Sequence, residues 1–428
     1  MADSLPYKKT VFPNGLRLIH IPMAASLTTT VLVLVGTGWE YETKDINGIS
    51  HFLEHLSFKG TKKRPTSQLL AAELDSLGAI YNAFTGNEVT GYFAKASNKS
   101  FKRIFDIISD LYLDPLFDSR EMDKERGVVL EEINMDEDLP MKKVEENFLA
   151  LLYGDQPAGW PGAGTKETIK KISRDDVLSY RRKHYLASKS LVVVAGGTDE
   201  DVESLTKEYF NGLASGEPAE KSPIVERQTV VGLHIQTKAT DQTHLVLGVR
   251  TFDIFDSRRY VLEVLNQILG GSMSSRLFEK IRNKMGVAYY VHSFAELSRD
   301  HGFFGATTGV DTNRLNEAVK ALLEEFKNLA QKPVPQSELQ KAKDCLSGKL
   351  VLGLETSDGV ASFYGQEEII TGRIETPEEI LENIRRVAAR EILEIARSFF
   401  KEEKLNLAII GPKSDPHKLR SLLESGLS

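Results

Sequence analysis

The run His51-Phe52-Leu53-Glu54-His55 decides how this sequence is read, because one short segment combines a helical pattern with metal chemistry. An α-helix turns by about 100° per residue, so His51 and His55 lie on one face with Glu54 beside them. Two imidazoles four residues apart can bind one zinc ion, and a carboxylate that is not a ligand can accept a proton from water there. With 9 His among 428 residues, chance is a poor explanation for this H-x-x-E-H spacing.

The apolar neighbours of the motif predict which way the helix faces. Four of them fall on the side opposite the histidines: Ile49, Phe52, Leu53 and Leu56. We expect this apolar side to pack on a sheet, which turns the two histidines away from the core. The alternative is a solvated helical face that happens to carry two histidines, and the apolar stripe favours the metal site over it.

A catalytic zinc site takes three protein ligands, so a third ligand is needed. The acidic helical segment 124–133 offers Glu125 and Glu132, which lie two turns apart on a face shared with two valines. Glu131 is rotated off that face by about 100°. A carboxylate among valines is costly unless it is paired or binds metal. We therefore predict Glu132 as the third ligand and Glu125 as an acid that orients a ligating histidine. The alternative, a solvated acidic run, fits residues 136–138 better.

On these residues the chain resembles the pitrilysin family of zinc peptidases, which includes insulin-degrading enzyme and the mitochondrial processing peptidase. It is most similar to the two-domain bacterial members. The family pattern is the inverzincin signature H-x-x-E-H, followed about 75 residues later by E-(x6)-E. The matching positions here are His51, Glu54, His55, Glu125 and Glu132.

Two further stretches carry the resemblance. Asn82-Ala83-Phe84-Thr85 resembles the family's edge strand that pairs with substrate, which implies that Asn82, Ala83 and Phe84 bind substrate. The segment 269–289 is similar to the family's glycine-rich stretch and downstream Arg/Tyr pair, here Arg282 and Tyr289, which hold the substrate carbonyl. Without the resemblance, that pair would be interpreted as an ordinary salt bridge and a core aromatic.

Composition indicates a soluble enzyme. The formal charge is −7 (54 minus 61) without a clustered basic stripe, which weighs against nucleic acid or an anionic membrane as a partner. The single Cys345 excludes an intrachain disulfide and a thiolate metal site. Because the sequence shows neither a signal-peptide pattern nor an apolar run of membrane-spanning length, we expect a cytoplasmic location.

The sequence also indicates a duplication. Apolar strand patterns at Ser190–Gly197 and Leu405–Gly411 each follow an amphipathic helix, at Arg174–Tyr185 and Ala389–Phe400. We predict an α+β fold of two homologous domains, each a mainly antiparallel sheet with helices packed on one face. The predicted domains are residues 1–215, a linker at 216–226 rich in Gly, Ser, Pro and charge, and residues 227–428.

Alignment of the repeats assigns the chemistry to one of them. Matching Gly60 with Gly270 places His51 opposite Val261, Glu54 opposite Val264 and His55 opposite Leu265. The first domain is therefore predicted to be catalytic and the second to keep the fold without the metal.

The predicted function is a zinc metalloendopeptidase with one Zn²⁺ per chain, in which Glu54 takes a proton from water and delivers it to the leaving amine. Substrate would lie as an added strand beside residues 81–84, which favours unfolded or short peptides. The resemblance further implies a clamshell chamber. Longer relatives build it from four domains, so we expect a homodimer with Arg282 and Tyr289 acting across the subunit interface.

Three alternatives stay open at this point. The first is a heterodimer with a metal-less paralogue. The second is a processing peptidase devoted to one precursor together with a partner subunit. The third is a non-catalytic structural subunit, as in relatives that belong to a respiratory complex.

Overall fold

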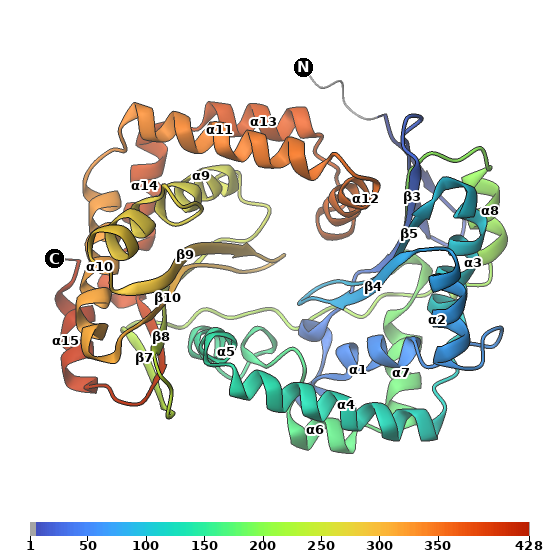
Figure 1. Ribbon diagram of the computed structural model, residues 1–428, viewed down its shortest axis with the longest axis horizontal. Helices are drawn as coiled ribbons and strands as arrows, with labels where there is room; N and C mark the ends of the chain where they lie inside the picture. The colour runs from blue at the N-terminus through green and yellow to red at the C-terminus, as the bar shows by residue number, and fades with distance from the viewer. Residues whose placement is uncertain (1–5, 428) are drawn as a thin grey trace. The chain divides into compact units, whose positions relative to one another are not determined.

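Two β-sheets organise the chain (Figure 1). The structure, a computed structural model, describes residues 6–427. The first sheet has the order β1-β2-β6-β3-β5-β4 and consists of β1 (Lys8–Val11), β2 (Arg17–Pro22), β3 (Thr28–Val35), β4 (Ile80–Thr85), β5 (Thr90–Ser97) and β6 (Ser190–Gly196). The second has the order β7-β11-β8-β10-β9 and consists of β7 (Gly232–Thr237), β8 (Thr243–Thr251), β9 (Ala288–Leu297), β10 (Gly302–Val310) and β11 (Asn406–Gly411).

The two sheets repeat one topology. The order β2-β6-β3-β5-β4 corresponds strand for strand to β7-β11-β8-β10-β9, and the corresponding strands also follow one another in the same order along the chain. The β2–β6 and β7–β11 pairs are parallel, whereas the other neighbouring strands are antiparallel. The predicted α+β class, with a mainly antiparallel sheet in each half, is confirmed.

The helices surround these sheets. The first half contains α1 (Ile49–Ser57), α2 (Ser67–Ser76), α3 (Phe101–Leu113), α4 (Ser119–Asp138), α5 (Pro140–Tyr153), α6 (Lys166–Lys171), α7 (Arg174–His184) and α8 (Val202–Phe210). The second half contains α9 (Arg259–Leu269), α10 (Leu315–Gln331), α11 (Gln336–Gly353), α12 (Ser357–Gln366), α13 (Pro377–Arg386), α14 (Ala389–Phe399) and α15 (Pro416–Ser425). Among the helices of residues 6–427, none is both long enough and apolar enough to cross a bilayer.

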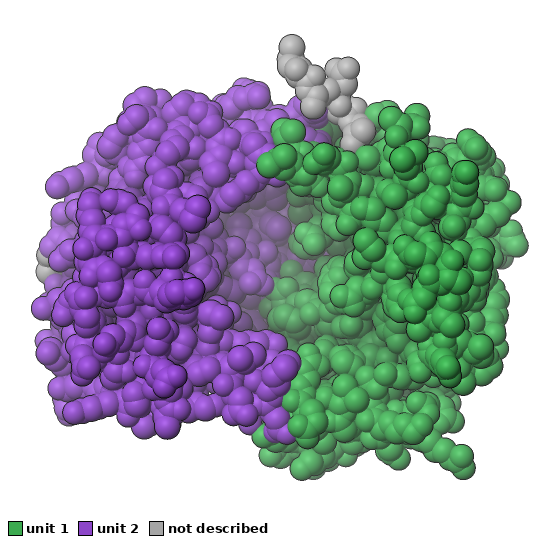
Figure 2. Space-filling model, viewed as in Figure 1, with its two compact units in different colours: residues 1–133, 161–222, 351–376 green, residues 134–160, 223–350, 377–428 purple. Residues whose placement is uncertain are grey.

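The compact units are not simply the two halves of the sequence. Unit 1 consists of residues up to 133, 161–222 and 351–376, and unit 2 consists of the remainder (green and purple in Figure 2). The units change over at residues 222–223, inside the predicted linker, but they also exchange two segments that the sequence analysis assigned to the other domain. Helix α5 contacts β7, β8 and β11 of unit 2, and α12 contacts β2, β3 and β6 of unit 1.

This exchange corrects the expectation that helices cover one face of each sheet. In unit 1, Val31 and Val33 of β3 belong to a core with α1 and α3, whereas Leu32 and Leu34 belong to a core on the opposite face. That second core includes the α12 residues Val360, Ala361 and Tyr364. The physical reason is visible in β3 itself, because its unbroken apolar run is typical of a strand buried on both faces.

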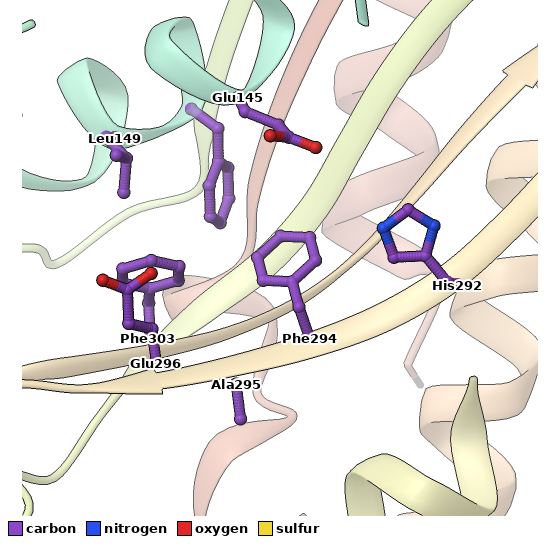
Figure 3. Close-up of a pocket in the computed structure, with 8 residues that line it drawn as sticks. Glu145, Leu149, His292, Phe294, Ala295, Glu296 and Phe303 are labelled. Carbon is purple, nitrogen blue, oxygen red and sulfur yellow. The ribbon is translucent and has the colours of Figure 1, made fainter. Parts of the chain in front are cut away.

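In the same way, helix α5 packs against the sheet of unit 2 although it comes from the first half of the sequence. The ring of Phe148 lies edge-on to Phe294 of β9 and Phe303 of β10, with centroids 6.3 and 6.2 Å apart. An open pocket remains beside these rings, lined by Glu145, Phe148, Leu149, His292, Phe294, Ala295, Glu296 and Phe303 (Figure 3). These rings belong to a core of mixed aromatic and aliphatic residues that joins the exchanged helix to the sheet of unit 2, and its aliphatic members include Val144, Leu152, Val246 and Ile410.

Candidate metal centre and active site

Helix α1 carries the three polar residues of the motif and is anchored to the core by its apolar side. Ile49, Phe52, Leu53 and Leu56 are all buried, whereas His51, Glu54 and His55 are partly exposed. The helix begins after Gly48, whose φ of +96° favours glycine and whose Cβ, if present, would lie 2.7 Å from the carbonyl oxygen of Ala163. The chain therefore enters α1 through a tight backbone contact that no larger residue permits.

Glu42 holds the start of this helix, and the sequence analysis missed it. Its carboxylate accepts hydrogen bonds from the backbone N–H groups of Gly48 (2.7 Å) and Ser50 (2.8 Å) and from Nδ2 of Asn47 (3.0 Å). These donors include N–H groups that a helix start leaves without an intrahelical partner. Burial raises the pKa of Glu42 to about 7, against the opposing effect of these hydrogen bonds. The sequence signal that could have identified Glu42 is its position as an acidic residue shortly before the predicted start of the helix.

The structure brings His51, His55 and Glu132 together. The Nε2 atoms of the two histidines are 3.2 Å apart, and Oε2 of Glu132 lies 3.6 Å from His51 Nε2 and 3.5 Å from His55 Nε2. A tetrahedral zinc site with ligand distances of about 2.0–2.1 Å has ligand–ligand edges of about 3.4 Å. The three donor atoms therefore have the spacing, as well as the chemistry, that fits a zinc ion.

Glu125 lies behind this trio and binds one of its histidines. Its Oε1 accepts a hydrogen bond from Nδ1 of His55 at 2.8 Å, and its Oε2 contacts Nζ of Lys59 at 2.6 Å. Burial would raise the pKa of Glu125, but the hydrogen bonds from His55 and Lys59 outweigh it and hold that pKa below its ordinary value. Since Nδ1 carries the proton in this arrangement, Nε2 is left with the lone pair a metal needs. Lys59 is a second residue that sequence reasoning missed.

Glu54 lies beside the trio and faces β4. Its Oε2 accepts a hydrogen bond from the Thr85 hydroxyl at 2.7 Å. Burial raises the pKa of the Glu54 carboxyl, and the nearby charge of Glu132 acts in the same direction, whereas Thr85 and His55 oppose the shift. A raised pKa is the property that lets a carboxylate accept a proton near neutral pH.

The predicted substrate-binding residues of β4 do not all face the same way. Ala83 is buried in the core that contains α1, whereas Phe84 lies over Gly91 and is 37% exposed, and Asn82 is exposed. Successive strand residues alternate between faces, so Phe84 points away from α1. Because β4 is the terminal strand of its sheet, main-chain groups along its outer edge are available for pairing with another strand.

Arg282 and Tyr289 lie in unit 2 and contact each other. Arg282 belongs to a π-helical turn, Phe278–Lys284, and its guanidinium lies 4.7 Å from the Phe278 ring centroid and 5.7 Å from that of Tyr289. Tyr289 is 77% exposed, so it is not a core aromatic. Local π-helical geometry is frequent at functional sites, and here it accompanies an exposed Arg/Tyr pair.

Comparisons with known proteins identify the family of the chain. Residues 21–166 match the family described as Insulinase (Peptidase family M16), and residues 171–346 match the Peptidase M16 inactive domain. A protein of Bacillus subtilis named as an uncharacterized zinc protease is 32% identical over 409 residues, 95% of this chain and 99% of that protein. A similarly named Streptomyces coelicolor protein is 31% identical over 420 residues, 96% of this chain and 91% of the other.

Solved structures show the same fold. A protease from Helicobacter pylori has a TM-score of 0.89 at 22% identity and covers 96% of this chain and 100% of its own. A peptidase M16 inactive domain from Pseudomonas fluorescens has a TM-score of 0.87 at 17% identity, covering 96% and 99%. Since two family models cover most of the sequence and the relatives match it almost from end to end, this chain belongs to peptidase family M16.

Proposed function

We propose that this chain is a zinc metalloendopeptidase that hydrolyses peptide bonds in unfolded or short peptides, with one zinc ion per chain. The observation that carries the proposal is the spacing of the His51, His55 and Glu132 donor atoms, which matches the edges of a zinc tetrahedron. The names of the relatives, zinc proteases, support zinc over another metal.

In the proposed reaction the chain's own residues divide the work. When bound, zinc supplies a Lewis acid that polarises the scissile carbonyl and allows water to react at neutral pH. Glu54 accepts a proton from the attacking water and gives it to the nitrogen of the leaving amine. Glu125 keeps His55 oriented as a ligand through the Nδ1 hydrogen bond. A peptide can pair along β4 only in extended form, and for this reason the proposed substrates are unfolded or short peptides.

The test is cleavage of a mixture of unstructured peptides, followed by mass spectrometry. Wild type and Glu54→Gln are compared, with the metal content of both determined. We expect cleavage by wild type alone and about one zinc per chain in both proteins, because the substitution leaves the three ligands intact. Absence of both zinc and cleavage would contradict the proposal and favour a structural subunit. Zinc without cleavage would favour a processing peptidase that needs its own precursor or a partner.

We further propose that the active form is a homodimer forming a clamshell chamber, with Arg282 and Tyr289 of one subunit acting at the metal centre of the other. The exposure of Tyr289 and its contact with Arg282 support a role in binding another molecule. The proposal also follows from the family resemblance, in which a two-domain chain needs a second copy to complete the chamber.

Complementation tests this arrangement directly. Glu54→Gln and Arg282→Ala chains are each expected to be inactive alone. When the two are co-expressed, half of the dimers are mixed and each holds one intact composite site, so about a quarter of wild-type activity should return. A mixture as inactive as its parts would place Arg282 in the same subunit as its metal centre, whereas an Arg282→Ala chain that is fully active alone would leave Arg282 without a role. A heterodimer with a paralogue would show as wild-type chain that is monomeric by analytical ultracentrifugation.

A further inference from the structure

Thr85 is the last residue of β4, and it contacts the proposed general base. Its hydroxyl donates to Oε2 of Glu54 at 2.7 Å. The backbone of Thr85 is fixed by antiparallel pairing with Thr90 of β5, and α1, which carries Glu54, packs against β4. The hydrogen bond therefore joins a side chain on a helix to a side chain on a strand of the same unit.

This contact can restrict the motion of the Glu54 side chain, as a catalytic base requires. A glutamate side chain has several rotatable bonds, and a catalytic group must be held within about 0.5 Å of its working position. Threonine is a stiff donor because its branched Cβ restricts χ1, and in a strand its backbone is fixed as well. A flexible acid is thus held by a rigid hydroxyl.

We propose that Thr85 is a positioning residue that holds the Glu54 carboxylate in the orientation needed for proton transfer. With Oε2 engaged by the Thr85 hydroxyl, Oε1 is the oxygen that takes the proton from water. The inference rests on the proposed function, since it assigns to Thr85 a role in the step that Glu54 performs.

The same contact links substrate binding to the base. β4 is the terminal strand of its sheet, and Thr85 ends it. A peptide that pairs along β4 lies beside the strand whose Thr85 holds the Glu54 carboxylate, so pairing positions the scissile bond relative to the base and contributes to the reaction rate as well as to binding. We therefore expect peptides too short to pair along β4 to have a lower kcat as well as a higher KM.

The test compares three substitutions. Thr85→Val keeps the shape and removes the donor, Thr85→Ser keeps the donor, and Thr90→Val is the matched control. The Thr90 hydroxyl donates to the carbonyl oxygen of Thr37, just after the end of β3, at 2.9 Å, so the control loses a buried hydrogen bond that does not involve Glu54. Zinc content and the melting temperature are measured on each variant, together with kcat and KM on one peptide.

A positioning role predicts a distinctive pattern. Thr85→Val should lower kcat about 10–100-fold at unchanged zinc content, because the base is then no longer held in the orientation for proton transfer. KM should stay within about twofold, and Thr85→Ser should recover kcat to within about threefold of wild type. Thr90→Val should lower the melting temperature without lowering kcat. A Thr85→Val enzyme whose kcat stays within about twofold of wild type would overturn the proposal.

A second readout does not depend on activity. Crystal structures of metal-free wild type and Thr85→Val should show one Glu54 orientation in the first and several, or a different one, in the second. An unchanged Glu54 orientation in Thr85→Val would refute the positioning role. If wild type cleaves no peptide, the proposed function fails, while this structural comparison still decides the role of Thr85.

Discussion

Glu125 connects the metal centre to a second charge. It receives the Nδ1 hydrogen bond of His55 on one oxygen and contacts the Lys59 ammonium with the other. Because it is only 5% exposed, it depends on both partners to remain ionised in the interior. The three residues form a chain in which Lys59 stabilises the carboxylate that holds His55, the proposed ligand.

Replacing Glu125 by Gln should therefore weaken zinc binding about 10–100-fold, the usual cost of losing a carboxylate that orients a ligating histidine. Competition against a chelator of known affinity measures the effect. Glu131→Gln on the same helix is the control, because Glu131 is exposed and rotated off the face that carries Glu125 and Glu132. Equal zinc affinity of wild type and Glu125→Gln would show that His55 needs no such partner.

The residues that sequence analysis found and missed differ in one physical respect. His51, Glu54 and His55 are related by the period of a single helix, and so are Glu125 and Glu132, so their shared faces follow from spacing alone. Lys59, Thr85 and Glu42 act through contacts made by loops and a strand. Thr85 reaches Glu54 from another element, and neither residue carries a local signal of that contact.

At the scale of elements, α1 is held by α7 as well as by Glu42. The hydroxyl of Tyr180 on α7 lies 2.7 Å from that of Ser50 on α1. His184, one turn further along α7, stacks on the Tyr180 ring with centroids 4.2 Å apart and is 4% exposed. A buried aromatic and imidazole pair thus lies behind the helix that carries the proposed metal ligands His51 and His55.

This packing predicts acid sensitivity. Burial lowers the pKa of His184 to about 4, and the neighbouring charges of Lys183 and Lys189 act in the same direction. A histidine with a lowered folded-state pKa contributes stability above pH 6.5, its ordinary value, which is lost as the pH falls toward 4. The wild type should lose about 3 kcal/mol more than His184→Phe over that window. Melting temperatures of both proteins between pH 7.5 and 4 test this, and parallel curves would contradict it.

The strands show how far an element's environment can be predicted. The unbroken apolar run of β3 is a pattern typical of burial on both faces, which the prediction of helices on one face did not use, and nothing in that run identifies the helix on the second face. An apolar stripe on a helix likewise shows that it is buried and not which sheet buries it. For this reason α5 and α12 were expected in their own halves, while the sheets themselves were predicted correctly.

At the scale of the whole molecule, the exchange makes each half of the sequence incomplete. The second face of the unit 1 sheet is covered by Val360, Ala361 and Tyr364, which are fully buried and come from residues beyond the changeover at 222–223. A fragment that ends at residue 222 therefore exposes an apolar sheet face, which is a typical cause of aggregation. Replacing Tyr364 by Ala in the full chain removes part of the same cover and should destabilise unit 1 by about 3–5 kcal/mol.

We expect residues 1–222 expressed alone to be insoluble or to unfold without cooperativity, and co-expression with residues 223–428 to restore a soluble complex. The two fragments can reassemble because each carries the helix that completes the other's sheet. Solubility, co-purification and the sharpness of the thermal transition are the measurements. A full-length chain cut at an inserted protease site near residue 222 is the control, since it should stay associated after cleavage. A soluble fragment 1–222 with a sharp transition of its own would show that α12 is dispensable and that the first half of the sequence folds as an independent domain.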